Sequence, residues 1–370
     1  MYPNDVNRPC KPSFVGPSSR TDARPRLAVS RRTTGGTEVF MPQRDSLRAT
    51  ICGAGAAGCM HALAFRSAGV SIVGVFDPNP AKAHALAELC GARAVASPEA
   101  LFAIDSELAS VCSPPPAHVH QAEVACRRDR IVFVEKPVAT TADELERVAQ
   151  LGRCVPVLQW RAGRALRSVR AAIHLGELGD APSVDCDLAW SRDGAYFQAG
   201  RATRSAWGGG VLLSVAIHAI CFVLSRRMAS ASGSLAYRQG VDVETSAVMT
   251  MAFEGGALAA LRATFDSSGD TTRLSFVGRE VAAVIEGTEV DPTAGRVLWH
   301  AREAARLRRL REIEEGCMGA QSAPLLVPFL HGAIEAVKRG AAPGECDTLP
   351  SVASAWAAHA AVFATYGANE

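Results

Sequence analysis

A glycine-rich turn between a strand-like run and a helical pattern constrains the fold more than any other feature. The apolar run Ala49–Cys52 leads directly into Gly53-Ala54-Gly55-Ala56-Ala57-Gly58. In a G-x-G-x-x-G turn the first glycine allows the tight bend, the second admits a pyrophosphate, and the third lets helix and strand pack closely. The helix N-terminus then faces the phosphate charge. A dinucleotide site is therefore predicted on Gly53, Gly55, Ala56, Ala57 and Gly58.

An acidic residue stands where such a site needs one. The second strand-like run, Val70–Phe76, ends in Asp77, about 20 residues beyond the last glycine, the usual distance for a ribose-binding carboxylate. An acid there accepts hydrogen bonds from both ribose hydroxyls and repels a 2′-phosphate, so we expect NAD(H) to be preferred and NADP(H) to be possible. The alternatives are a glycine-rich turn without a ligand and an Asp77 that only shapes the turn before Pro78.

Strand and helix patterns alternate beyond the turn, which favours a doubly wound parallel sheet with right-handed crossovers. The expected helices span Met60–Ala68, Ala81–Leu89, Pro98–Ala103 and His118–Arg127, and the expected further strands span Ala92–Val95, Leu108–Cys112 and Ile131–Val134. Ligands of such sheets bind at the carboxyl ends of the strands. Ser113-Pro114-Pro115-Pro116 and Glu135-Lys136-Pro137 both follow strands at that edge.

The second half of the chain is rich in strand patterns. The expected strands span Val184–Trp190, Ser234–Tyr237, Ala247–Phe253, Ala257–Thr264, Arg273–Val277 and Val281–Glu286, and the pair around Glu254-Gly255-Gly256 indicates a hairpin. Helices are expected over Ala165–His174, Val327–Lys338 and Ser351–Tyr366, and the apolar run Val211–Leu224 indicates a core helix. The polar stretch Ala301–Glu315 is expected to be a solvated helix or loop.

Composition excludes several classes of protein. A formal charge of +2 with 21% charged residues gives no basic field for nucleic acid. The longest apolar run is shorter than the roughly 20 residues that a membrane span needs. The 11 cysteines include no C-x-x-C pair, which argues against a zinc ribbon or a disulfide framework, and we expect free thiols in the cytoplasm and no metal site.

Four regions are expected: a disordered tail over 1–46, a nucleotide-binding domain over 47–165, a substrate and oligomerisation domain over 166–330, and C-terminal helices over 331–370 that pack back on the core. The tail carries Pro, Ser, Gly and Arg without a hydrophobic period. Its alternatives are a transit-like segment and a start codon placed too early, with Met41 as the true start.

Four ordered features together resemble the glucose-fructose oxidoreductase, inositol dehydrogenase and MocA family of nicotinamide-dependent oxidoreductases. They are the glycine turn with Asp77, Ser113-Pro114-Pro115-Pro116-Ala117-His118, Glu135-Lys136-Pro137, and Gly208-Gly209-Gly210-Val211-Leu212 leading to His218. The resemblance runs from about Ala49 to the C-terminal helices. It implies a Rossmann domain followed by an α/β domain, whose large, mostly antiparallel sheet exposes one face for a homodimer or homotetramer.

The resemblance also implies roles for individual residues. Lys136 and His218 would be the acid–base pair that moves the hydroxyl proton during hydride transfer. The cofactor would contact Ser113, Pro114, His118, Glu135 and Lys136, with a cis bond before Pro137. The substrate would contact Arg161, Tyr196, Ser214 and His218. Without a site, Lys136 would be a surface lysine and His218 a hydrogen-bonded core histidine.

Some positions depart from the family pattern G-G-G-x-L-x-D-x-G-x-H-x-x-D. Ser214 replaces the first Asp, Ala216 replaces the Gly that follows it, and Cys221 replaces the last Asp. In the family pattern the carboxylate of that last Asp could orient the histidine, here His218. Gly200 stands where a tryptophan is common, and Asp129 where a glycine is usual.

The favoured function is oxidation of a secondary alcohol, or reduction of the ketone, on a sugar, sugar nucleotide or cyclitol.

The alternatives share the fold. One is NAD-dependent glycoside cleavage without net redox; another is C=N or C=C reduction or dihydrodiol oxidation. The third is a sensor that binds the dinucleotide without turnover.

Overall fold

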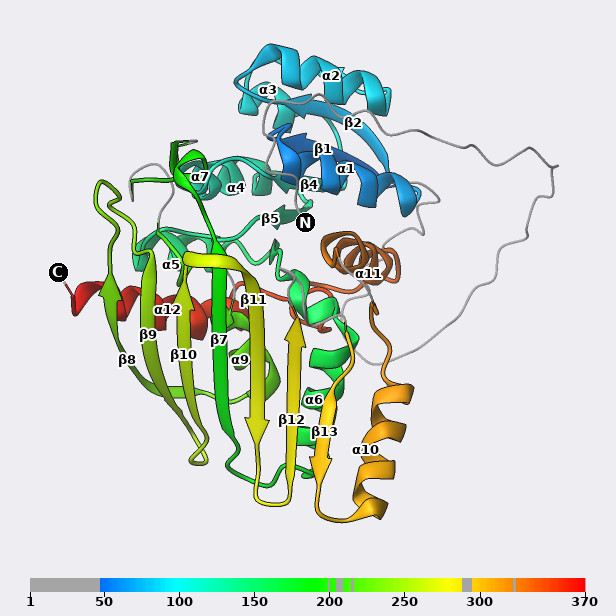
Figure 1. Cartoon of the computed structure of the whole chain (residues 1–370). Helices are drawn as coiled ribbons and strands as arrows, with labels where there is room; N and C mark the ends of the chain where they lie inside the picture. The colour runs from blue at the N-terminus through cyan, green and yellow to red at the C-terminus, as the bar shows by residue number, and fades with distance from the viewer. Residues whose placement is uncertain are drawn as a thin grey trace, which may run out of the picture.

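The computed structural model describes residues 47–198, 200–203, 209–213, 216–287, 295–321 and 324–369. The predicted tail over 1–46, Gly208 and Ser214 lie outside these ranges. The described chain builds two sheets, one in the N-terminal part and one in the C-terminal part, with helices packed against both (Figure 1).

The first sheet is the predicted doubly wound sheet, with six parallel strands in the order β3-β2-β1-β4-β5-β6. The strands are β1 (Arg48–Cys52), β2 (Ser71–Phe76), β3 (Arg93–Ala94), β4 (Leu108–Val111), β5 (Ile131–Val134) and β6 (Cys154–Pro156). Its helices are α1 (Ala56–Ser67), α2 (Pro80–Cys90), α3 (Pro98–Ala103), η1 (Pro115–Ala117), α4 (His118–Cys126) and α5 (Ala142–Gln150). The order reverses between β1 and β4, and ligands of such sheets bind at that switch point.

Local sequence signals explain where these helices begin. Asn79, Ser97 and Thr141 precede α2, α3 and α5, and each side chain accepts a hydrogen bond from a backbone N–H of the first turn. Proline follows at the start of α2 and α3, where its missing N–H is harmless. By contrast, α1 begins behind Gly55 with no capping side chain.

The second sheet has seven strands in the order β13-β12-β11-β7-β10-β9-β8. Its strands are β7 (Ser183–Ser191), β8 (Met228–Ala236), β9 (Ser246–Phe253), β10 (Leu258–Thr264), β11 (Asp266–Val277), β12 (Val281–Gly287) and β13 (Leu298–Ala301). Only the β7–β10 pair is parallel among the pairings of these strands. The expected mostly antiparallel sheet and the β9–β10 hairpin are thus confirmed.

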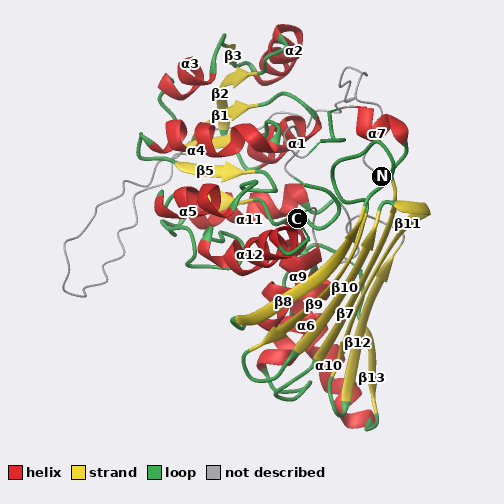
Figure 2. Cartoon of the chain, turned by 90° about the vertical axis from the view of Figure 1, so that its left-hand side faces the viewer, coloured by secondary structure: helices red, strands yellow, loops and turns green. Residues whose placement is uncertain are grey.

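Helices cover one face of this second sheet. In the second half the helices are η2 (Gln159–Ala162), α6 (Arg164–His174), α7 (Gly194–Gln198), α9 (Ala216–Leu224), α10 (Ala304–Gly316), α11 (Leu326–Lys338) and α12 (Ala353–Gly367). α6, α9 and α10 lie on one side of the sheet, and among the described elements none covers the other side (Figure 2). α11 instead packs against α1, which ties the C-terminal helices to the first domain.

Three details differ from the sequence predictions. α10 is not merely solvated, because Leu310 and Glu314 are buried and Glu314 accepts hydrogen bonds from Val297 N and Trp299 Nε1. The helix expected from residue 211 begins at Ala216. The boundary expected between 330 and 331 falls inside α11. Among the described helices, none combines the length and apolarity needed to cross a bilayer.

Candidate active site

The glycine turn connects β1 to α1 in a conformation that excludes side chains at two positions. Gly53 has φ +103°, and its N–H donates to Phe76 O at 2.7 Å. A Cβ at Gly58 would stand 1.9 Å from Gly53 O. These two glycines are therefore required by the backbone itself, as the motif predicts.

The middle of the turn is open. A Cβ at Gly55 would meet nothing within 4 Å, Ala56 is exposed, and the first turn of α1 contains no acidic residue. The free N–H groups of this helix end carry a partial positive charge. This geometry and charge fit a dinucleotide pyrophosphate.

Asp77 lies at the end of β2 against the same turn. Its Oδ2 accepts a hydrogen bond from Ala54 N at 2.8 Å, and its Oδ1 accepts one from Asn79 N at 2.8 Å. The carboxylate is half-buried. It is thus fixed beside the turn, where ribose hydroxyls can reach its remaining lone pairs.

His118 connects the two loops at the carboxyl ends of β4 and β5. Its Nε2 is 2.7 Å from Ser113 O, and its Nδ1 is 2.7 Å from Pro137 O. The ring is buried, and desolvation lowers its pKa although both carbonyl contacts favour the charged form. Both nitrogens are occupied by backbone, so His118 holds the Lys136-Pro137 loop, whose peptide bond is cis. Ser113 Oγ donates to Gln121 Oε1 at 2.7 Å.

A buried hydrogen-bond chain runs beneath that loop. His61 of α1 contacts Ser110 Oγ through Nδ1 at 2.8 Å and Glu135 Oε1 through Nε2 at 3.1 Å. The other Glu135 oxygen accepts from Lys136 N at 3.1 Å. Burial raises the pKa of Glu135, but His61 and Lys136 outweigh it and the net shift is downward. Glu135 is therefore an anion that fixes the backbone at Lys136.

Lys136, Arg161 and His218 come together on one small cavity, although they lie far apart in the sequence. Its other lining residues are Leu158, Gln159, Trp160 and Ala219. Lys136 follows β5, Arg161 lies in η2 after β6, and His218 lies in the first turns of α9. The cavity thus sits between the first sheet's carboxyl edge and the second domain.

His218 is held as a neutral imidazole. It is only 7% exposed, and its Nδ1 has no hydrogen-bond partner. Desolvation lowers its pKa well below the ordinary value, and the charges of His359, Arg161 and Lys136 lower it further. Cys221 stands where the family pattern has a carboxylate, and burial raises the pKa of its thiol to about 12, so it supplies no negative charge.

His359 of α12 contacts the ring of His218 and the backbone of the loop that follows Lys136. Its ring centroid lies 4.9 Å from that of His218, and its Nε2 accepts from Val138 N at 3.4 Å. Its Nδ1 contacts Ala355 O at 3.2 Å. One helix thereby contacts the ring of His218 and the loop that carries Lys136.

Arg161 lines the cavity but is partly held by α12. Two of its nitrogens donate to Ser354 Oγ and Ser354 O at 3.2 and 3.1 Å, and its guanidinium lies 5.0 Å from the Phe222 ring centroid. Its Nε is buried without a partner. Burial lowers its pKa to about 10, which leaves it a cation at neutral pH.

The glycine loop before His218 is held by a buried acid. Glu244 accepts hydrogen bonds from Gly210 N and Leu212 N at 2.9 Å and from Tyr366 Oη at 2.9 Å. Its own carbonyl accepts from Val211 N. A Cβ at Gly210 would lie 1.9 Å from Glu244 O, so this glycine too is required by packing. Burial raises the pKa of Glu244.

Tyr196 is not among the cavity-lining residues. It lies in α7, with its ring 5.7 Å from that of Phe265 and with the Arg201 and Arg192 guanidinium groups 4.7 and 5.5 Å from its centroid. Burial raises its pKa against the effect of these cations. A substrate contact of Tyr196 stays a prediction.

The sequence alone did not single out His61, Glu244, Ser354, His359 or Tyr366. Their partners lie between 32 and 221 residues away in the chain, except for local bonds. The only available signal was their polarity inside otherwise apolar patterns, which does not identify a partner.

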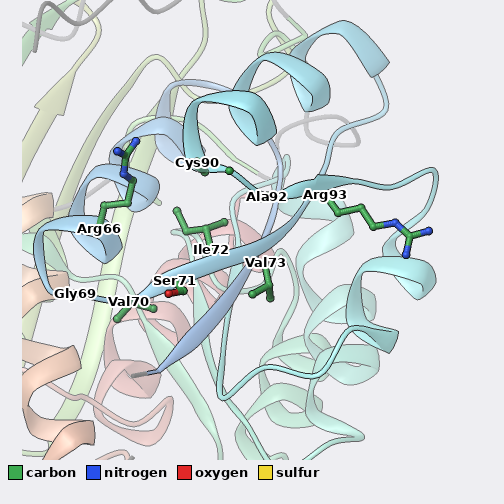
Figure 3. A pocket seen from close by; sticks show the side chains of 10 residues that line it. Arg66, Gly69, Val70, Ser71, Ile72, Val73, Cys90, Ala92 and Arg93 are labelled. Carbon is green, nitrogen blue, oxygen red and sulfur yellow. The ribbon is translucent and has the colours of Figure 1, made fainter. Parts of the chain in front are cut away.

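A larger surface hollow of about 800 Å³ lies elsewhere, along the starts of β2 and β3 (Figure 3). Arg66, Cys90 and Arg93 are among the residues that line it. It opens at the amino ends of the strands, on the edge opposite the glycine turn. Within the described ranges, no three His, Cys, Asp or Glu side chains gather as a metal-binding group.

Comparisons with known proteins cover both sheets. Residues 47–157 match the oxidoreductase family with an NAD-binding Rossmann fold, and residues 166–284 match the GFO/IDH/MocA C-terminal domain. The inositol 2-dehydrogenase of Rubrobacter xylanophilus is 26% identical over 331 residues, covering 84% of this chain and 89% of that protein.

Two solved structures share the fold. The WlbA dehydrogenase of Chromobacterium violaceum, in complex with NADH and UDP-GlcNAcA, has a TM-score of 0.75 at 19% identity and covers 89% of this chain and 96% of its own. A levoglucosan dehydrogenase with NADH and levoglucosan has a TM-score of 0.70 at 18% identity, covering 87% and 98%.

Proposed function

The chain belongs to the GFO/IDH/MocA family of NAD-binding oxidoreductases, and we propose that it moves a hydride between nicotinamide and a secondary alcohol or ketone of a sugar, sugar nucleotide or cyclitol. The observation that carries this proposal is the meeting of Lys136 and His218 on one cavity at the carboxyl edge of the nucleotide-binding sheet. The similarity to proteins named for inositol, a UDP-sugar and levoglucosan supports a polyhydroxylated substrate.

We assign the proton step to Lys136. When bound, the nicotinamide supplies the hydride acceptor for oxidation or the hydride donor for reduction. An alcohol that loses a hydride must also lose its hydroxyl proton. His218 is a poor proton acceptor, because its pKa lies well below the ordinary value. Its neutral imidazole instead orients the hydroxyl by a hydrogen bond, while Lys136 exchanges the proton.

Cofactor binding is assigned to the open turn and Asp77. The pyrophosphate would lie against the N–H groups at Gly55, Ala56 and Ala57, and Asp77 would accept from the ribose hydroxyls. Ser113 and Pro114 would flank the nicotinamide end. The position of Arg161 among the residues that line the cavity supports a substrate role for it.

The first test is a fluorescence titration with NADH and with NADPH. We expect the unmodified chain to bind NADH more tightly. Asp77→Ala removes the ribose acceptors and is expected to weaken NADH binding about thirtyfold, with a smaller change for NADPH, because two lost hydrogen bonds cost about 1 kcal/mol each. Asp77→Asn retains an acceptor for Ala54 N but loses the one for Asn79 N, and it tests the need for the negative charge with the side chain's size unchanged. Absence of binding by both nucleotides would sink the proposal.

A second copy of the chain is the proposed partner for the open face of the second sheet. Large apolar side chains on that sheet are exposed: Val248, Leu258, Val277 and Leu298 are between 46% and 57% accessible. Single exposed apolar residues are ordinary, but four across one sheet favour burial in an interface. We expect a dimer or tetramer by light scattering, and Val248→Lys with Leu258→Lys should reduce the mass to that of one chain. A monomeric unmodified protein contradicts this.

The compartment stays a prediction. All ten cysteines of the described part are free thiols, which supports the expected cytoplasmic, reducing environment. No nucleic acid or membrane partner is part of the proposal.

A further inference from the structure

Two cysteines of the nucleotide-binding domain lie in contact, away from the candidate active site. Cys126 is the last residue of α4 and Cys154 the first of β6, and their Sγ atoms are 3.6 Å apart. Cys126 is half-buried, whereas Cys154 is only 2% exposed. Neither residue has a part in the hydride transfer proposed above.

The charges of two arginines, Arg130 and Arg153, act on Cys126. Arg130 is 1% exposed, and its Nη2 donates to Phe102 O and Ile104 O, while its Nε and Nη1 are buried without a hydrogen-bond partner. Arg153 directly precedes Cys154 and forms an ion pair with Asp129. A buried guanidinium with unused donors favours a nearby anion.

The pKa values of the two thiols are shifted in opposite directions. The hydrogen bond with Cys154 lowers the pKa of the Cys126 thiol, and the charges of Arg153 and Arg130 lower it further, although burial opposes them. The same hydrogen bond and burial raise the pKa of Cys154. Of the two sulfurs, the more accessible one of Cys126 therefore loses its proton more readily, and the thiol of Cys154 stays protonated beside it.

We propose that Cys126 and Cys154 form a reversible oxidation site in which a hydroperoxide converts the two thiols into a disulfide. The Cys126 thiolate attacks a peroxide oxygen, the O–O bond breaks, and Cys126 becomes a sulfenic acid. Cys154 then attacks that sulfur, a water leaves, and the S–S bond forms. The two thiols lose two electrons and two protons, and hydrogen peroxide becomes two waters.

Cys52 and Cys90 lack this combination of a lowered pKa and a neighbouring thiol. Cys52 is buried beneath the glycine turn, and burial raises its pKa to about 12. Cys90, at the end of α2, matches Cys126 in exposure, but burial raises its pKa despite Arg66 nearby. It has no hydrogen bond to a second thiol among the described residues. Cys90 is therefore the matched control.

The test uses the full-length purified chain, fully reduced and then treated with hydrogen peroxide. We expect the intact mass to fall by about 2 Da through one disulfide, and a non-reducing digest to join the peptides of Cys126 and Cys154. Dithiothreitol should reverse both changes. Iodoacetamide at pH 7 should alkylate Cys126 at least tenfold faster than Cys90 in the untreated protein, since only the thiolate reacts.

Variants assign the roles of the two sulfurs. Cys154→Ser should let peroxide carry Cys126 on to sulfinic acid, while Cys90→Ser should leave the disulfide unchanged. A disulfide between other cysteines, no mass loss, or equal alkylation of Cys126 and Cys90 would overturn the proposal. Because the readout is mass and not turnover, it stands or fails independently of the proposed enzyme activity.

Discussion

Lys136→Met is expected to abolish most of the turnover while leaving the dinucleotide site intact. A positioned proton donor or acceptor contributes roughly 10²- to 10⁴-fold to a rate, so kcat should fall by about that factor. The methionine side chain would retain the aliphatic volume between β5 and Pro137. The dissociation constant for NADH should change less than about threefold, because the turn and Asp77 follow β1 and β2, whereas Lys136 follows β5.

Two further variants separate charge from proton transfer. Lys136→Arg keeps a cation but holds its proton too tightly to exchange it, so turnover should stay low. Lys82→Met removes an exposed lysine of α2 and should change neither constant. The assay follows nicotinamide absorbance with a panel of sugars, cyclitols and sugar nucleotides. A Lys136→Met protein with normal kcat would contradict the assignment.

The same series distinguishes the alternatives. A protein that only senses dinucleotide would bind NADH and turn over none of the substrates, with or without Lys136. A glycoside-cleaving enzyme would release its product with no net change in nicotinamide absorbance. Of the three, only an oxidoreductase changes the nicotinamide absorbance in a way that depends on Lys136.

The local part of the architecture was predictable because its signals are local. The turn from Gly53 to Gly58, the strand before Asp77 and the helix Pro98–Ala103 are each encoded within a few residues, and the structure confirms them. The strand patterns that end before Ser113 and Glu135 likewise placed two loops at one sheet edge. These local patterns predict the fold class and the loops at the carboxyl edge of the first sheet.

The packing around the catalytic candidates was not predictable in this way. His359 accepts a hydrogen bond from Val138 N, 221 residues away in the sequence. Glu244 accepts one from Tyr366, which lies in α12. These contacts depend on how α12 docks, and docking depends on the summed fit of many side chains. The structure shows both ring nitrogens of His118 in contact with backbone carbonyls, and its cofactor contact stays a prediction.

Acid is expected to destabilise the fold sharply because burial lowers the pKa of three histidines in it. His118, His218 and His359 are each at most 7% exposed, and burial is the first cause that lowers the pKa of all three. A base whose pKa is lower in the folded state binds fewer protons there than when unfolded. The stability that depends on the neutral rings is therefore present above pH 6.5 and is lost as the pH falls toward the folded-state values.

The pKa of His359 sets the size of the expected loss in folding free energy. Its pKa falls from 6.5 to about 4 in the folded protein, so protonation of the unfolded chain between these pH values costs about 3 kcal/mol of folding free energy. Urea unfolding at pH 7.5, 6.0, 5.0 and 4.5 should show the decline. His359→Phe should lower stability at pH 7.5, through loss of its bonds to Val138 and Ala355, yet flatten the decline by about one proton. His84→Gln, at an exposed position of α2, controls for loss of an imidazole. An unchanged slope in His359→Phe would show that the acid sensitivity arises elsewhere.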